Sequence, residues 1–103
     1  MTGKKRAELD AVLRDILGNS HCYFQPPESI KLKFPCIIYE REGYSVRHAD
    51  NSPYMSSKRY SIKLIYKDPD SALPDKIQDL PMCSFDRRFV SDNLYHDVFT
   101  IYW

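Results

Sequence analysis

The chain has 103 residues, of which 43% are hydrophobic and 14% aromatic, and its formal net charge is +1. This composition predicts one folded domain and excludes a disordered chain, because there is enough apolar surface to build a single core. The near-neutral charge argues against the general attraction to polyanions of a basic nucleic-acid-binding domain. Cys22, Cys36 and Cys83 are widely spaced, which argues against a disulfide framework or a zinc knuckle and fits reduced thiols.

The first predicted element is an amphipathic helix over about Lys4 to Leu17. Its apolar residues recur with the spacing of one helical stripe: Leu9, Val12, Leu13, Ile16 and Leu17. Gly18 is typical of the left-handed residue that ends a helix. Since the basic N-terminus leads directly into this amphipathic pattern, we expect neither a signal peptide nor a membrane span.

The next predicted segments are a connector, a strand and a long loop. We expect Ser20 to Lys33 to be irregular, because the two prolines within it cannot donate hydrogen bonds to a sheet. Alternating residues predict a strand from Pro35 to Glu42. The polar segment 41–57 has no long apolar period, so we expect a projecting loop there with a short strand near Tyr44 to Arg47.

A second strand and a short second helix follow this loop. Lys58 to Lys67 alternates between an apolar face and a mostly basic face; the apolar residues are Tyr60, Ile62, Leu64 and Tyr66. Leu73 to Leu80 has helical spacing, with Pro74 in the first turn, where the missing amide hydrogen costs nothing.

Two further strands complete the chain. Met82 to Val90 alternates so that Cys83, Phe85, Arg87 and Phe89 are expected on one face. A turn at residues 91–93 leads into a last strand, Leu94 to Trp103. Because both faces of that strand carry large side chains, we expect the second face to be covered by a helix or by another copy of the chain.

The order of elements predicts the fold class. Helix, strand, strand, helix, strand, strand (α-β-β-α-β-β) is typical of an α+β domain. We expect a mainly antiparallel sheet of four to five strands with two helices packed on one face. A single domain would span residues 1–103, with the long loop at about 41–57 projecting from it.

Three places in the sequence combine residues used in catalysis: His21 with Cys22, His48 with Asp50, and His96 with Asp97. Neighbouring residues on a strand point to opposite faces, so His96 and Asp97 are badly placed to act as a pair. His21 and Cys22 lack a third group nearby. The His and Cys residues lack metal-ligand spacing, and with three glycines there is no phosphate-binding loop. We expect no enzyme, cofactor or metal; a thiol hydrolase using Cys22 remains an alternative.

Four segments resemble those of small neck or tail-completion proteins of long-tailed bacteriophages, and most closely the tail terminators. They are Phe24–Pro27, Ala49–Tyr54, Tyr66–Ser71 and Asp92–Trp103. The resemblance implies a structural α+β subunit that forms a homo-oligomeric ring, a hexamer, at the head-proximal end of the tail tube and joins tail to head. It also implies contacts with the tail tube protein and with a head connector or head-completion protein, and a location in the virion neck after assembly in the host cytoplasm. Related neck proteins act as head-closure stoppers, which is the alternative within this group.

A ring of this kind suggests roles for particular residues. Phe99, Tyr102, Trp103 and Arg87 are candidates for the interface between subunits; Arg47, Asp50 and Tyr54 for loop contacts to a neighbouring ring; and Arg59 and Lys63 for a lumen-facing surface. The genome would pass through the lumen without tight binding, because the chain has too few excess cations. Arg87 has an alternative role in an intramolecular pair with Asp86, Asp92 or Asp97, or lying over aromatic rings.

The alternative of another class is a small single-stranded nucleic-acid-binding module. Aromatic residues on a sheet would then stack on bases beside basic side chains. The candidates are Tyr60, Tyr66, Phe85 and Phe89, beside Lys63 and Arg87.

Overall fold

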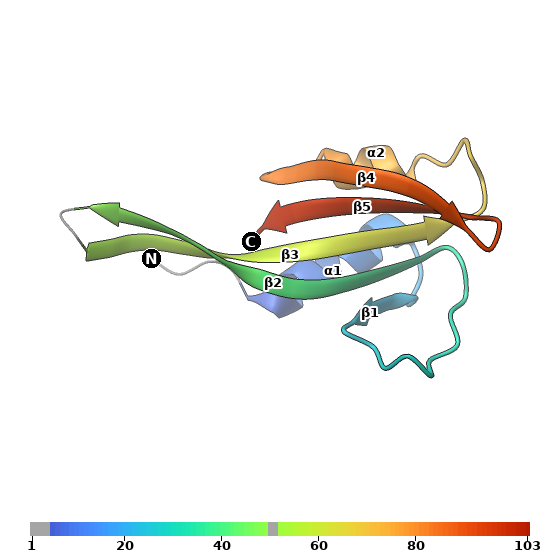
Figure 1. Ribbon diagram of the computed structural model, residues 1–103, viewed down its shortest axis with the longest axis horizontal. Helices are drawn as coiled ribbons and strands as arrows, with labels where there is room; N and C mark the ends of the chain where they lie inside the picture. The colour runs from blue at the N-terminus through green and yellow to red at the C-terminus, as the bar shows by residue number, and fades with distance from the viewer. Residues whose placement is uncertain (1–4, 50–51) are drawn as a thin grey trace.

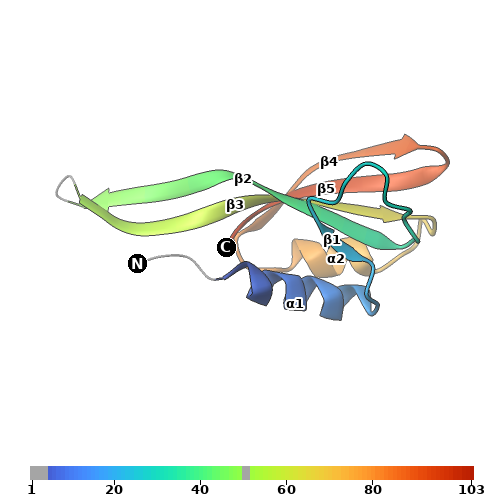
Figure 2. The same ribbon diagram turned by 90° about the horizontal axis from the view of Figure 1, so that it is seen from below.

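The structure is a computed structural model that describes the backbone of residues 5–49 and 52–103 and the side chains of residues 5–43 and 58–103. Its elements are α1 (Arg6–Leu17), β1 (Cys22–Phe24), β2 (Cys36–Ala49), β3 (Ser52–Tyr66), α2 (Leu73–Gln78), β4 (Cys83–Ser91) and β5 (Leu94–Tyr102). They form an α+β domain in which both helices lie on the same side of one sheet (Figures 1 and 2).

The sheet has five strands in the order β1-β2-β3-β5-β4. β1 is parallel to β2, and the other neighbouring pairs are antiparallel. The predicted α+β class is confirmed at this level, and the two predicted helices agree with α1 and α2. The two-residue turn between β4 and β5 is formed by Asp92 and Asn93, which both have positive φ, as in the hairpin turns that match the twist of a sheet.

β1 was not predicted, because three residues are too few to show a periodicity. Its pairing with β2 includes hydrogen bonds from the Ile37 amide to the His21 carbonyl and from the Gln25 amide to the Tyr39 carbonyl. Arg14 of α1 adds a second support by donating to the carbonyl of Cys22 at 3.0 Å. Part of the expected irregular connector is therefore a strand, which is held by its pairing with β2 and by Arg14.

β2 and β3 continue beyond the rest of the sheet as a two-stranded arm, which we define as residues 43–49 and 52–57. β5 stops where Tyr102 lies opposite Arg59, and Trp103 exchanges two backbone hydrogen bonds with Lys58. Beyond this point, the described backbone of β2 and β3 pairs only within the arm, which extends past the body in Figures 1 and 2. The segment expected to be a projecting loop at about 41–57, with a short strand near Tyr44 to Arg47, belongs in its described residues to β2 and β3, since paired strands here need no apolar alternation.

The core lies between α1 and the sheet. Leu9, Leu13 and Leu17 form the buried stripe of the helix. They belong to one apolar cluster with side chains from four strands and α2: Cys22, Ile37, Tyr39, Tyr60, Ile62, Leu64, Tyr66, Phe99, Ile101 and Ile77. The predicted apolar face of the Lys58–Lys67 strand is confirmed as part of this core.

A polar contact also ties α1 to the sheet. The Tyr39 hydroxyl donates to an Asp10 carboxylate oxygen at 2.5 Å, and Arg14 forms an ion pair with the same carboxylate. Arg6 donates to the Tyr39 hydroxyl oxygen at 3.2 Å. Burial and the hydrogen bond to Asp10 raise the pKa of Tyr39 above its usual value. The ring of Tyr39 thus sits in the core while its hydroxyl keeps polar partners.

The sheet face away from the helices, here called the open face, is partly buried within the subunit. Val98 on this face is 5% exposed, and Lys63 and Arg87 flank it in the register of the strands. Thr100 and Tyr102 are half-buried. The expectation that the second face of the last strand needs a helix or another copy was therefore wrong for Val98, because long neighbouring side chains surround it.

Replacing Leu13 by Ala tests the docking of α1. Leu13 is fully buried, so the substitution should lower the free energy of unfolding by about 2–5 kcal/mol through lost burial and a cavity. Glu8→Ala, at an exposed position of the same helix, is the control and should change it by less than about 0.5 kcal/mol. Equal urea midpoints for the two variants would contradict the packing described above.

Candidate functional site

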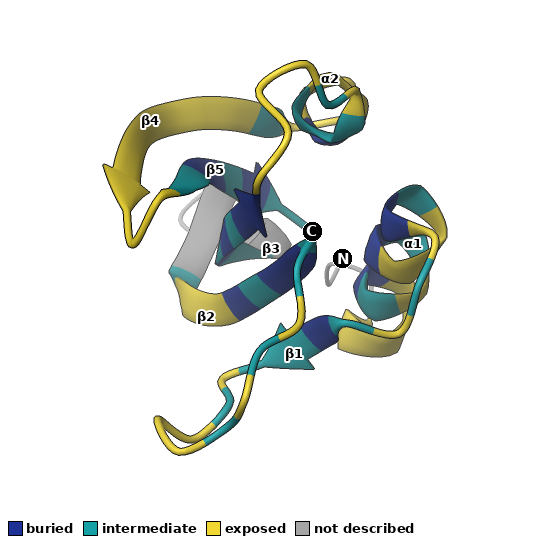
Figure 3. Ribbon diagram, turned by 90° about the vertical axis from the view of Figure 1, so that its right-hand side faces the viewer, coloured by how far each residue is buried: buried dark blue, intermediate teal, exposed yellow. Residues whose placement is uncertain are grey.

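β4 is an outer strand of the sheet and is exposed along most of its length (Figure 3). Met82, directly before it, is 66% exposed, and Phe85 and Val90 within it are 48% and 63% exposed. An outer strand also presents backbone groups without a strand partner on one side. Apolar side chains that gather at such an edge are typical of a surface that contacts another molecule.

A β-bulge in β4 changes which side chains share a face. Phe85 lies opposite Phe99, but Arg87 lies opposite Val98, so Asp86 is an extra residue in β4. Before the bulge Cys83 and Phe85 face the helices, whereas after it Arg87 and Phe89 face the open side. The prediction that these four residues share one face was wrong, because a bulge shifts the alternation by one residue.

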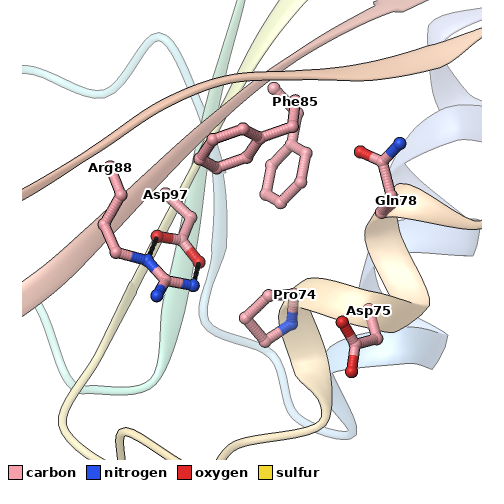
Figure 4. Close-up of a pocket in the computed structure, with 7 residues that line it drawn as sticks. Pro74, Asp75, Gln78, Phe85, Arg88 and Asp97 are labelled. Atoms are coloured by element: carbon pink, nitrogen blue, oxygen red, sulfur yellow. Dashed lines mark hydrogen bonds and ion pairs between the residues drawn. The ribbon is translucent and has the colours of Figure 1, made fainter.

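A groove of about 380 Å³ lies between α2 and β4 on the helix side of the sheet (Figure 4). We call it the α2–β4 groove. Its lining residues are Pro74, Asp75 and Gln78 from α2, Phe85 and Arg88 from β4, and Asp97 and Phe99 from β5. The rings of Phe85 and Phe99 pack edge to face with their centroids 5.6 Å apart, and both residues line the groove.

Asp97 forms the polar part of the groove floor and is fully buried. Arg88 donates to its two carboxylate oxygens from Nε at 2.6 Å and Nη2 at 3.0 Å, and the Tyr66 hydroxyl donates to it at 2.8 Å. Burial and the hydrogen bond to this carboxylate raise the pKa of Tyr66 to about 12. The bidentate pair joins β4 to β5.

Aromatic and basic side chains meet on the open face. Phe89 stacks on His96 with ring centroids 4.6 Å apart, and Lys63 Nζ and Arg87 Cζ each lie 5.9 Å from the Phe89 ring. Arg87 also pairs with Asp86 at 3.8 Å and remains 66% exposed. Within the single chain, Arg87 thus makes the intramolecular contacts that were the alternative to an interface role.

The other residues expected at a subunit interface have different environments. Phe99 is 1% exposed and belongs to the subunit's own core, so the expectation that its ring meets a neighbour was wrong. Tyr102 and Trp103 are half-buried. Trp103 donates from its indole to the Lys5 carbonyl at 3.0 Å. Tyr102 lies opposite Arg59 and Trp103 pairs with Lys58, so both residues lie at the base of the arm, with their side chains on opposite faces of the sheet.

The expected lumen residues Arg59 and Lys63 share the open face. Arg59 pairs with Glu42 at 3.6 Å. The expected loop-contact residues Arg47, Asp50 and Tyr54 lie outside the described side chains. Tyr60 and Tyr66 point into the core, so two of the four aromatic rings expected to stack on nucleic-acid bases are not available to do so.

The candidates for catalysis do not form a site among the described residues. His96 and Asp97 point to opposite faces, as predicted, and His48 and Asp50 lie outside the described side chains. Cys22 is buried, and burial raises the pKa of its thiol to about 12; burial raises that of Cys36 and of Cys83 to about 11. These environments oppose formation of the thiolate that a nucleophilic cysteine needs.

The α2–β4 groove could not be predicted from the sequence. The periodicity of residues 82–90 predicted a strand but not its position at the edge of the sheet, and no sequence pattern marks Asp86 as a bulge. Arg88 and Asp97 are nine residues apart on two strands, and only the hairpin register makes them partners. The four large apolar residues Met82, Phe85, Phe89 and Val90 prove to be exposed only in the structure.

No protein-family model and no curated protein matches this chain. Among the described residues, no helix combines the length and apolar character needed to cross a bilayer. The same part of the chain contains no group of three or more His, Cys, Asp or Glu side chains placed to hold a metal ion.

The Asp97→Asn substitution tests the buried pair. It would leave Arg88 without its charged partner, and we expect a loss of roughly 2–4 kcal/mol in the free energy of unfolding, limited by the half-exposed position of Arg88. Asp86→Asn is the control, because Asp86 is exposed and lies 3.8 Å from Arg87. If both variants unfolded at the same urea concentration, the pair would have no stabilising role.

The raised thiol pKa of Cys22 predicts a loss of stability at high pH. In the unfolded chain the thiol ionises near its ordinary value of 9.0, whereas in the folded chain it does so only near 12. Its contribution is therefore complete below pH 9 and decreases by up to about 1.4 kcal/mol per pH unit as the pH rises toward 12. Urea midpoints between pH 7 and 10.5 should fall less steeply for Cys22→Ala than for the unchanged chain; identical slopes would refute this assignment.

Proposed function

We propose that this chain is a structural virion protein, a phage tail terminator that forms a ring at the head-proximal end of the tail tube and joins tail to head. The observation that carries the proposal is the edge strand β4, whose exposed apolar side chains lie beside a groove. A surface of this kind fits permanent contact with another protein. The resemblance of four sequence segments to tail terminators suggests which assembly this surface serves. In the alternative, a head-closure stopper would use the same surfaces with different neighbours.

The arm supports an assembly role on physical grounds. A two-stranded ribbon without a third strand or a packed face is only marginally stable in water. The arm has no third strand among the described residues, so contact with a neighbouring molecule would stabilise it. In this proposal the arm reaches the adjoining tube or connector ring, with Arg47, Asp50 and Tyr54 making the contacts.

The open face is the proposed lumen surface. It carries Arg59, Lys63 and Arg87, of which Arg59 and Arg87 already have acidic neighbours. A surface with so few unpaired cations would let the genome pass without holding it, because tight binding depends on the release of many counterions. DNA is therefore a passing contact in this proposal and the protein neighbours are the lasting ones.

The experiment is a tube-capping assay with candidate tail tube proteins. Added below equimolar amounts, the protein should stop tube growth and appear as a ring at one end in electron micrographs. Arg47→Ala should remain folded but lower the fraction of capped tubes, while Lys31→Ala, on the exposed connector, should cap normally. Unlimited tube growth in the presence of the unchanged protein would remove the terminator role.

A further inference from the structure

Two different surfaces of the subunit each combine an apolar side chain with charged residues, and the charges of the two surfaces are opposite in sign. The first is the α2–β4 groove, with Phe85 as its exposed apolar side chain. Asp75 lines the groove from α2, and Asp79, the residue that ends this helix, lies one helical turn further on. Both are exposed, so their charges are available to a basic partner.

The second surface lies at the base of the arm, and we call it the carboxyl-terminal patch. Trp103 is its aromatic centre and pairs with Lys58 through two backbone hydrogen bonds. Lys5 lies against Trp103, whose indole donates to its carbonyl. A half-buried aromatic side chain on the helix side of the sheet thus lies beside two basic residues.

We propose that the α2–β4 groove of one copy receives the carboxyl-terminal patch of a second copy. Trp103 would pack on Phe85 and Pro74, while Lys5 and Lys58 would face Asp75 and Asp79. Apolar centres with complementary charged rims are the usual anatomy of protein interfaces. This inference rests on the proposed ring and names the two surfaces that build it.

The contact is head-to-tail, because the two surfaces are different parts of the same chain. Each added copy then leaves one free groove and one free patch, so assembly continues until the rotation between neighbours closes a ring. The bulge supports this use of β4 over edge-to-edge strand pairing. It places Asp86 and two arginines in the middle of the outer strand, and charges and bulges there disfavour the addition of another strand.

A charge-reversal exchange tests the proposal by sedimentation velocity and native mass measurement. The groove variant carries Asp75→Lys and Asp79→Lys; the patch variant carries Lys5→Glu and Lys58→Glu. Alone, each should assemble at least about tenfold more weakly than the unchanged chain, because like charges meet at the contact. Mixed in equal amounts, they should regain assembly as closed rings with the two variants alternating in a 1:1 ratio.

Two controls separate the contact from general effects of charge and folding. Lys31→Glu with Lys33→Glu makes the same charge change as the patch variant on the exposed connector and should assemble normally. Phe85→Ser should weaken assembly, whereas Val90→Ser, at a 63% exposed apolar position of the same strand, should not. Circular dichroism and urea unfolding would verify that all variants fold.

The outcomes distinguish this inference from the proposed function. If the unchanged chain forms rings and either reversal variant alone assembles equally well, the named contact is wrong while the ring stands. If the reversal variants fail alone and also fail when mixed, the two surfaces do not meet, and the inference is overturned again. If the unchanged chain sediments as a 12.2 kDa monomer at every concentration, with and without tube protein, the ring itself is refuted.

Discussion

The structure depends on the shift of alternation that Asp86 introduces into β4. Because one extra residue separates Phe85 from Arg87, Arg88 turns toward the helix side and reaches the buried carboxylate of Asp97. A regular strand would place Arg87 there and Arg88 on the open face. The bulge therefore decides that Arg88 is the partner of Asp97, and that Arg87 and Phe89 lie beside Lys63 on the open face.

The ion pair between Arg88 and Asp97 matters more for the position of β4 than for net stability. Removing one partner of a buried pair is costly, but a pair is weak evidence for net stabilisation compared with apolar packing. Its clearer effect is geometric, since a bidentate contact fixes the position of β4 relative to β5. An outer strand with a neighbour on one side only gains rigidity in this way, and a rigid edge loses less entropy when it binds a partner.

Sequence patterns predicted the elements whose residues repeat with a clear period and missed β1 and the arm. The stripe of α1 was placed within two residues, whereas the strand predicted from the alternation of Tyr60, Ile62, Leu64 and Tyr66 begins six residues earlier than expected, at Ser52. β1 is too short to show a period, and the arm is defined by its backbone pairing. Predicting the groove would also require the order of the strands, the bulge and the position of α2, none of which leaves a periodic signal in the sequence.

For the last strand, β5, the sequence pattern predicted the strand but not which of its residues are covered within the subunit. Its two faces both carry large side chains, which in a small domain suggested an outside partner for the whole strand. In the structure β5 is the fourth of five strands and lies between β3 and β4, so the register gives Val98 flanking residues on both sides. Tyr95 near the start of β5 and Tyr102 at its end are half-buried. β4 begins opposite Ile101 and the arm departs beside Tyr102, so the exposure at this end follows from where the neighbouring strands stop, and the strand's own pattern of side chains does not determine it.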